Sequence, residues 1–472
     1  MPPKPRSRKT VYTAEQVAEF VCDESDSDFD FDEDCGRVCG DGDNCESDVE
    51  ETDDILPIDF LVQLPPDFER IDSEDGSDSD SEVITDSNCD SDSASDDPTE
   101  SISAEYTSKS GRHWTKVQPP ERGRPPLANI VTRRSGVIPG VTVENEKMAF
   151  WLFFYDILDK VAFYTNLEGR RLCALSETSH FKKHWKPVSR KDIDCFVGIQ
   201  VVYILAGAYR QHYRNVHHLF DPKRGFPAFR AAMSRTRFEI IKSVFRFDDR
   251  RRPFSDGVFG KIEEMWKMLM QTLGQFYNPN PELCIDEQLL EFHGRVAFRQ
   301  YMATKPGKFG IKIFWLTDAI NSYALCGIPY IGKETTSSYD FPNISAFADK
   351  ISIQLLRPFL NRGYNVTGDN YFTSATLMEY LWENRTTYVG PFRRNRRELP
   401  QEATRTPKQP KGTTNFYRSE KILLVSYTDK KATLSVLLGL TMHKAVIPAE
   451  NEKPEVVNHY NKHKSGVDNF GP

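Results

Sequence analysis

Residues 283–288 read Leu-Cys-Ile-Asp-Glu-Gln, and residues 364–374 read Tyr-Asn-Val-Thr-Gly-Asp-Asn-Tyr-Phe-Thr-Ser. Each stretch is a short apolar strand pattern that runs into an aspartate, Asp286 in the first and Asp369 in the second. The carboxyl ends of the strands in a parallel α/β sheet line the functional crevice, so we expect these two side chains to lie close together there. Taken alone, each aspartate has the alternative interpretation of a helix N-cap or a turn residue.

The sequence on either side of Pro281 predicts two kinds of structure. Before it, apolar residues recur at three- and four-residue spacing, which predicts helices that begin near Phe150, Ser189, Thr236 and Gly260. After it, β-rich runs come first and then alternate with helices, which predicts an α/β layer with a mixed sheet. The expected elements are strands at 283–286, 310–316 and 323–330, a helix at 346–360, a strand at 364–368, a helix at 373–382, a strand at 387–392, strand-like sequence at 421–440 and a helix at 451–470. The polar stretch 395–420 is expected to be a loop or an insertion.

Charge is divided unevenly along the 472 residues. Residues 21–100 hold 31 Asp and Glu against two Arg, a net of −29, whereas the rest of the chain holds 59 Lys and Arg against 38 Asp and Glu, a net of +21. Such an acidic, Ser-rich segment repels itself and buries too little apolar surface to offset its ordering entropy, so we expect it to be disordered. Its serines are followed by acids three residues on, as in Ser25 with Asp28, which suits an acid-directed kinase. A plain solubilising tail is the alternative.

Several classes of protein are disfavoured by the sequence. The chain opens without an apolar signal region, and its longest apolar stretch, 196–208, is too short to span a bilayer, so we expect neither secretion nor a membrane span. The nine cysteines are scattered and form no paired CxxC site, which predicts a reducing compartment and no evident zinc site. Two HxxxH pairs, His180/His184 and His459/His463, lack a third ligand, and we do not expect a metal at either pair.

The predicted chemistry follows from Asp286 and Asp369. Two carboxylates brought together repel, which raises a pKa or recruits a cation. Mg²⁺ suits them because it binds few protein carboxylates and keeps its other positions for water and phosphate oxygens. Two such ions, with Mn²⁺ as a substitute, would support phosphodiester transfer. The net charge of +21 indicates a nucleic-acid partner, and the basic residues assigned to DNA are Lys305, Lys308, Lys312, Arg393, Arg394, Arg396 and Arg397.

From about residue 137 to 468 the sequence resembles the piggyBac family of cut-and-paste DNA transposases. The resemblance is carried by an ordered series of motifs: Cys284-Ile-Asp-Glu-Gln-Leu-Leu290, Lys305-Pro-Gly-Lys-Phe-Gly-Ile-Lys312, Gly368-Asp-Asn-Tyr-Phe-Thr-Ser374 and Lys464-Ser-Gly-Val-Asp468, preceded by Met233-Ser-Arg-Thr-Arg-Phe238 and Phe245-Arg-Phe-Asp-Asp249. Each motif is weak by itself, but their order over roughly 330 residues is specific.

The resemblance implies a DDD-type, RNase H-like catalytic domain whose metal-binding and catalytic aspartates are Asp286, Asp369 and Asp468. It divides the chain into a disordered acidic region 1–136, a mainly α-helical dimerisation and DNA-binding domain 137–280, a first catalytic part 281–394, an insertion 395–454 and a last catalytic part 455–472. The implied reaction is metal-dependent cleavage at transposon ends in double-stranded DNA. The freed 3′-hydroxyl then forms hairpins, and integration follows at TTAA sites.

The resemblance also implies a homodimer and a nuclear location. The family typically places a further aspartate three residues after the third one and continues into a cysteine-rich zinc domain, whereas here Gly471 stands at that position and the sequence ends at Pro472. We therefore expect a chain shortened at its C-terminal end. Two hypotheses stay open: an active transposase, and a host-adopted, catalytically inactive nuclear protein that binds DNA or chromatin.

Overall fold

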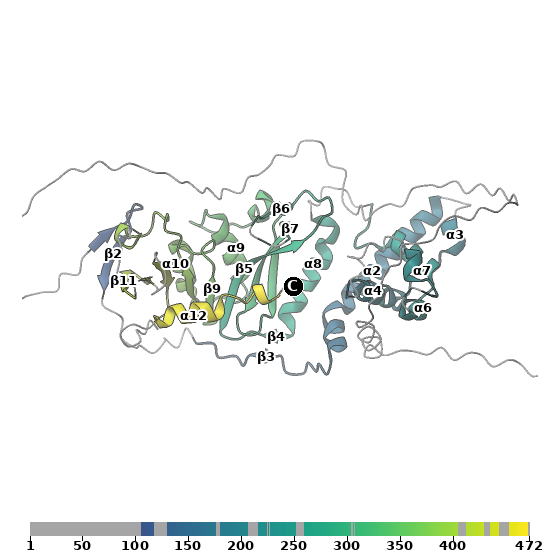
Figure 1. Ribbon diagram of the computed structural model, residues 1–472, viewed down its shortest axis with the longest axis horizontal. Helices are drawn as coiled ribbons and strands as arrows, with labels where there is room; N and C mark the ends of the chain where they lie inside the picture. Colours follow the sequence, from purple (N-terminus) through teal and green to yellow (C-terminus); the bar gives the residue numbers. More distant parts are fainter. Residues whose placement is uncertain are drawn as a thin grey trace, which may run out of the picture. The chain divides into compact units, whose positions relative to one another are not determined.

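The computed structural model describes residues 105–117, 130–175, 180–205, 216–223, 225, 227–251, 259–303, 305, 307–404, 412–428, 435–442 and 453–470 (Figure 1). These residues divide into two units, one of residues 140–275 and one of residues 276–470 together with 105–117 and 130–139. The division between Gln275 and Phe276 lies near the expected domain boundary at 280. The functions predicted for the two domains, DNA binding with dimerisation and catalysis, stay predictions. Among the described residues, no helix is long and apolar enough to cross a membrane.

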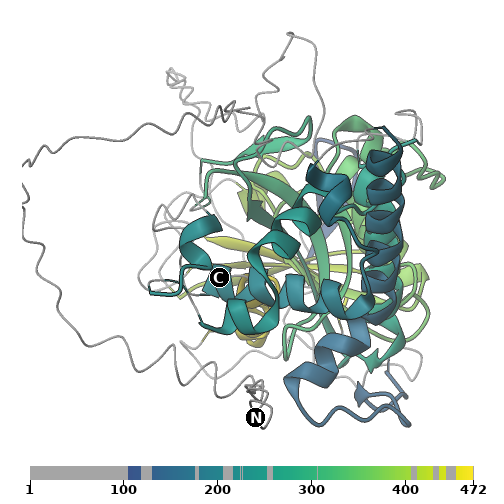
Figure 2. The ribbon, with the colours of Figure 1, turned by 90° about the vertical axis from the view of Figure 1, so that its right-hand side faces the viewer.

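The first unit is helical, as the periodicity before Pro281 predicts (Figure 2). Its helices pack on a shared apolar core in which Val161, Ile193 and Ile241 are fully buried. Ser234 begins one helix by accepting a hydrogen bond from the amide of Arg237, a standard N-cap. The helices are α2 Glu146–Leu175, α3 His180–His184, α4 Arg190–Leu205, α5 Val216–Leu219, α6 Pro227–Ala232, α7 Arg235–Val244 and α8 Gly260–Gln275.

Arginines in this helical unit are drawn into internal ion pairs. Glu168 is buried, and its carboxylate is bound by Arg171 at 2.7 Å, Arg250 at 3.3 Å and Arg246 at 3.6 Å. Burying a carboxylate is unfavourable unless it is paired, and these partners together hold the pKa of Glu168 below its usual value although burial alone would raise it. Part of the positive charge in this unit therefore balances a buried acid.

The second unit is built on one mixed sheet. Its strands run in the order β1-β2-β11-β12-β13-β10-β9-β5-β7-β6, and β8 also pairs with β7. The strands are β1 Glu105–Thr107, β2 His113–Val117, β5 Glu282–Glu291, β6 Arg299–Tyr301, β7 Phe309–Asp318, β8 Ala324–Pro329, β9 Asn365–Gly368, β10 Thr387–Pro391, β11 Thr414–Ser419, β12 Ile422–Tyr427 and β13 Val436–Leu440. A separate short ribbon pairs β3 Gly136–Val137 with β4 Tyr277–Asn278. The predicted mixed α/β layer is confirmed.

Helices cover both faces of this sheet. On one face, α9 Phe347–Leu356 and α10 Ala375–Glu383 pack with Leu283, Ile285 and Val366 in the main core. On the other, Val456 and Val457 of α12 Glu455–His463 pack with β10, β12 and β13. Side chains alternate along a strand, so Cys284 and Asp286 face the same side as α12.

Two expectations about irregular regions are wrong. Residues 105–117, inside the region expected to be disordered, form β1 and β2, and β2 pairs with β11. The stretch 395–420 contains a short helix, α11 Gln401–Thr404, and the strand β11, so it is not a plain loop. In both cases a strand of moderate polarity gains its stability from pairing with a distant strand. The expected disorder of residues 1–104 and 118–129 lies outside the described residues.

Trp114 tests how strongly the β1–β2 segment belongs to the fold. Its ring is fully buried in the main core, and its indole N–H donates to the carbonyl of Glu398 at 2.8 Å. We predict that Trp114→Ala lowers the free energy of unfolding by about 3–5 kcal/mol, measured by chemical denaturation. The matched control is His113→Ala, because His113 is the exposed residue next to Trp114. Equal, small effects of the two substitutions would contradict this account.

Candidate active site

The pairing of β5 with β9 brings the two predicted aspartates together. The two strands are parallel, and Ile285 is paired with Gly368 in their register. The next residues are Asp286, within β5, and Asp369, directly after β9, and alternation places both on the face that carries Cys284 and Thr367. The expectation that these two aspartates lie close together is confirmed, although β5 continues past Asp286 to Glu291.

Three carboxylates gather at this edge. Asp286, Asp369 and Glu287 each offer an oxygen within 4.8 Å of the other two. Asp286 accepts a hydrogen bond from the amide of Glu287 at 2.8 Å, and Asp369 accepts one from the amide of Tyr371 at 3.2 Å. These backbone bonds fix one oxygen of each aspartate. Glu287 was not predicted from the sequence: alternation along a strand would place it on the face opposite to Asp286, and only the structure brings its carboxylate into the group.

The electrostatics of this group favour a cation. Burial, with added repulsion from Glu287 and Asp369, raises the pKa of Asp286 to about 7. Burial and Glu287 also raise the pKa of Asp369, although Arg393 and Lys305 oppose the shift. A divalent cation would offset this repulsion, and oxygen ligands at a partly buried site are the set that Mg²⁺ and Mn²⁺ prefer. The residues therefore fit a divalent metal ion.

Asp468 lies after α12, at the start of the 3₁₀ turn Asp468–Phe470, and its side chain is exposed. Within the described residues it is not part of the carboxylate group around Asp286. The charge of Asp468 nevertheless affects a residue that Asp286 and Asp369 also affect. Burial raises the pKa of Tyr460, and the charges of Asp369, Asp286 and Asp468 raise it further. The role of Asp468 as a third ligand stays a prediction.

The segment before Asp468 lies close against β5 and β7. The thiol of Cys284 donates to the carbonyl of Lys464 at 3.3 Å. A Cβ atom on Gly466 would lie 2.6 Å from the hydroxyl oxygen of Thr317 and 2.8 Å from Cβ of Cys284, distances that real side chains do not reach. Glycine is therefore required for this approach, which explains its place in the Gly-Val-Asp element.

Hydrogen bonds behind Asp369 hold its loop in place. Thr373 donates to the carbonyl of Asp369 at 2.8 Å, and Ser374 caps α10 by accepting from the amide of Leu377 at 3.0 Å. The hydroxyl of Ser374 in turn donates to the buried carboxylate of Asp349 at 2.9 Å. The loop between β9 and α10 is thus fixed at several points, which supports a precise position for Asp369.

Comparison with known proteins identifies the chain. A family profile described as "Transposase IS4" matches residues 147–470. The solved structure titled "Cryo-EM structure of piggyBac transposase synaptic complex with hairpin DNA (SNHP)" matches with a TM-score of 0.62 and 30% identity, covering 72% of this chain and 70% of that chain. The chain belongs to the piggyBac family of transposases. The family implies a divalent-metal active site, consistent with the acidic group at Asp286 and Asp369.

Curated relatives of this piggyBac-family chain include two human proteins. The PiggyBac transposable element-derived protein 3 is 23% identical over 251 residues, which is 50% of this chain and 42% of that protein. The Chimeric ERCC6-PGBD3 protein is also 23% identical over 251 residues, which is 24% of its length. The chain therefore spans less than half the length of these curated relatives.

The predicted DNA-contacting residues of this piggyBac-family chain fall into different environments. Lys305 donates to the carbonyl of Glu287 at 3.4 Å, and Arg393 donates to the side-chain carbonyl of Asn370 at 3.1 Å, so both lie beside the acidic group. The ammonium of Lys312 lies 5.0 Å from the ring centre of Tyr371. Lys308 is exposed in the turn between β6 and β7. DNA contact by these residues stays a prediction.

The arginine run 393–397 is divided by the structure. Arg394 donates to the carbonyls of Thr404 and Ser435, and burial lowers its pKa. Arg396 donates to the carbonyl of Thr373 at 2.9 Å, whereas the side chain of Arg397 is exposed. Arg394 and Arg396 therefore stabilise the fold around the site, and Arg393 and Arg397 are better placed to contact a ligand.

The pH dependence of stability tests the support behind Asp369. Burial raises the pKa of Asp349 to about 6 from an ordinary 3.8, despite the hydrogen bond from Ser374. Because the folded state holds this proton more tightly, the free energy of unfolding falls as the pH rises from about 4 to 6. We predict that Asp349→Asn, which keeps an acceptor for Ser374, removes a decrease of about 3 kcal/mol between pH 4 and pH 7. Urea titrations at each pH measure this decrease in the free energy of unfolding. Parallel pH profiles of that free energy for Asp349→Asn and wild type would contradict the prediction.

Proposed function

We propose that this chain is a metal-dependent DNA strand transferase of the cut-and-paste type. The observation that supports it most directly is the meeting of Asp286 and Asp369 where the parallel pairing of β5 with β9 ends. The structural relative at 30% identity is described as a transposase in a synaptic complex with hairpin DNA. We propose that this chain likewise acts on double-stranded DNA, at transposon ends and at TTAA target sites.

The topology supports an RNase H-like catalytic core. β5 pairs antiparallel with β7, and β7 with β8, whereas β5, β9 and β10 are mutually parallel. Helices α9 and α10 cover one face and α12 the other. Strands β11, β12 and β13 lie within the predicted insertion 395–454. They extend the sheet beyond β10, so the insertion continues the sheet of the proposed catalytic core.

In this proposal Asp286 and Asp369 hold the divalent ions, with Asp468 as the third ligand. Bound Mg²⁺ would activate a water or a 3′-hydroxyl and stabilise the leaving oxygen. The chain's own residues position the acids: the Glu287 amide orients Asp286, and Thr373 holds the backbone of Asp369. Burial and the neighbouring carboxylates raise the pKa of Asp286 to about 7, and a bound cation would favour its ionised form. Lys305 and Arg393 lie where a DNA phosphate would approach the acids.

Further features of the proposal follow from the family and the charge distribution. We propose a homodimer acting in the nucleus, with the acidic segment 21–100 as a substrate for an acid-directed kinase. The acidic segment, at −29, would compete with DNA for the basic remainder at +21.

A second candidate is a host-adopted DNA-binding protein without catalysis. The exposed position of Asp468, outside the carboxylate group, favours it, because strand transfer requires a complete ligand set. One of the human relatives is itself named a transposable element-derived protein. Both candidates retain DNA binding, so catalysis separates them.

A strand-cleavage assay on transposon-end DNA with Mg²⁺ decides between these candidates. We predict Mg²⁺-dependent cleavage by wild type and a loss of at least about 100-fold in Asp286→Ala and Asp369→Ala, because each removes a metal ligand. Asp340→Ala, an exposed acid elsewhere in the same unit, is the control and retains activity. Wild-type activity no higher than that of Asp286→Ala would reject the enzyme.

The salt dependence of DNA affinity tests the basic residues. We predict that Lys308→Ala and Arg397→Ala each reduce the slope of log K against log salt by about 0.9, since each removes one phosphate contact. Arg394→Gln is the contrasting variant: it leaves the slope unchanged and lowers thermal stability, because Arg394 is bound within the fold. Fluorescence anisotropy at several salt concentrations gives the slopes. A reduced slope for Arg394→Gln alone would contradict the assignment.

A further inference from the structure

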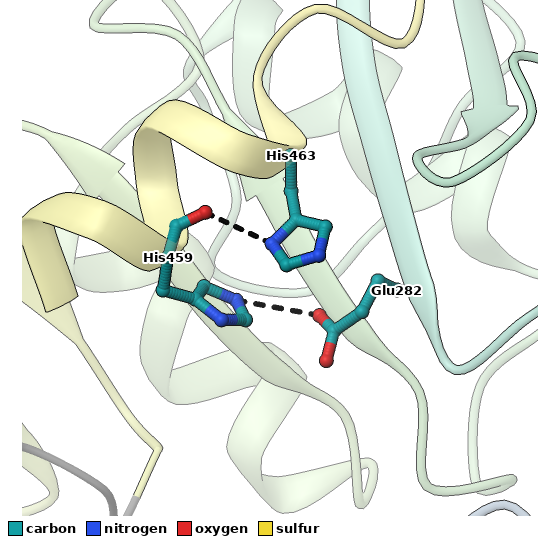
Figure 3. Close-up of side chains that lie close together, drawn as sticks. All are labelled: Glu282, His459 and His463. Atoms are coloured by element: carbon teal, nitrogen blue, oxygen red, sulfur yellow. Dashed lines mark hydrogen bonds and ion pairs between the residues drawn. The ribbon is translucent and has the colours of Figure 1, made fainter. Parts of the chain in front are cut away.

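A second group of ligand-type side chains lies at the opposite edge of the same parallel strands. Glu282, at the amino end of β5, is paired in register with Asn365 of β9, which is paired with Thr387 of β10. His459 and His463 approach this edge from one face of α12 (Figure 3). No third ligand was evident for this HxxxH pair from the sequence. In the structure, Glu282 comes close to it from a strand more than 170 positions away.

The donor atoms have the spacing of a metal site. One ligand atom from each of Glu282, His459 and His463 lies within 4.8 Å of the other two. The Nε2 atom of His459 is 3.4 Å from a carboxylate oxygen of Glu282. Two ligands of a tetrahedral Zn²⁺ ion, with bonds of about 2.1 Å, lie roughly 3.4 Å apart. This pair is therefore already at the separation that a shared ion would set.

Neighbouring groups orient these ligands. The Nδ1 of His463 donates to the carbonyl of His459 at 2.9 Å, which leaves Nε2 of His463 as the atom that binds a metal (Figure 3). The amide nitrogen of Asn365 lies 2.6 Å from the Glu282 carboxylate and 3.2 Å from Nε2 of His459, and Asn365 is itself held by Thr387 at 2.9 Å. Glu282 and His459 thus present their acceptor atoms to the Asn365 amide group, and an ion bound at Nε2 of His459 would take the place of this contact.

The protonation states also suit a metal. Burial lowers the pKa of the nearly inaccessible His463, and the neighbouring His459 lowers it further, which favours the neutral imidazole. Burial alone would raise the pKa of Glu282, but the hydrogen bond and charge of His459 and the hydrogen bond of Asn365 outweigh it and lower this pKa. A neutral imidazole at His463 and an ionised carboxylate at Glu282 are forms that bind Zn²⁺, and a bound ion would displace a proton from His459.

We propose that Glu282, His459 and His463 form a structural zinc site that fastens α12 to β5, separate from the carboxylate group at Asp286. A two-His, one-carboxylate set selects a borderline cation such as Zn²⁺ over Mg²⁺, which prefers oxygen ligands alone. Because the chain runs directly from α12 through Gly466 to Asp468, the ion would restrict the position of that aspartate. The proposal rests on the geometry of this edge and not on strand transfer.

Zinc binding to the full chain in excess Mg²⁺ tests the proposal. The probe is Zn²⁺ itself, counted by mass spectrometry after desalting, with Co²⁺ absorption as a second readout. We expect wild type to retain one more Zn²⁺ than His459→Gln and than Glu282→Gln. We also expect Zn²⁺ to raise the melting temperature of wild type but not of either variant.

The chain provides a matched control and a safeguard. The double variant His180→Gln/His184→Gln removes the other HxxxH pair, in α3, and should leave both the zinc count and the zinc-dependent melting shift unchanged. Cysteines of residues 21–100 that bind zinc contribute equally to all variants, so the difference between proteins carries the result. Circular dichroism checks that the His459 and Glu282 variants fold, as we expect because both side chains are partly exposed. An equal zinc count in wild type and His459→Gln, including none in both, would overturn the proposal.

Discussion

The parallel pairing of β5 with β9 is the interaction on which the rest of the second unit depends. With Ile285 opposite Gly368, the next residues are Asp286, within β5, and Asp369, directly after β9, and the pleat turns both to the face covered by α12. The same register places Glu282 opposite Asn365 at the other end of the strands. A slip of one residue would move every one of these side chains to the wrong face. One backbone register therefore builds both groups of ligands.

Holding carboxylates together opposes folding, and the surrounding structure compensates. Burial and repulsion raise the pKa of Asp286 and of Asp369. Lys305 and Arg393 offset part of that repulsion, while Thr373, Ser374 and the buried Asp349 fix the loop that carries Asp369. The unit thus stores electrostatic strain at the place where a cation would relieve it, a pattern common at functional sites.

The sequence predicted those features that local pattern controls. Asp286 and Asp369 were found because each follows a short apolar run, although β5 continues past Asp286 to Glu291, and the helices of the first unit were found from their periodicity. The strands β1 and β2 were missed because their stability comes from pairing with β11, about 300 residues away. Glu282 was missed because only tertiary packing brings it to His459, and the exposure of Asp468 depends on how the turn after α12 is held.

We infer that Asp286 and Asp369 together bind a divalent cation. Electron paramagnetic resonance of Mn²⁺ added to the full chain measures this binding directly, with Asp286→Asn/Asp369→Asn as the comparison. We expect wild type to bind Mn²⁺ at a site from which Mg²⁺ displaces it, and the double variant to lack that site. Equal, Mg²⁺-sensitive Mn²⁺ binding by the two proteins would contradict the claim.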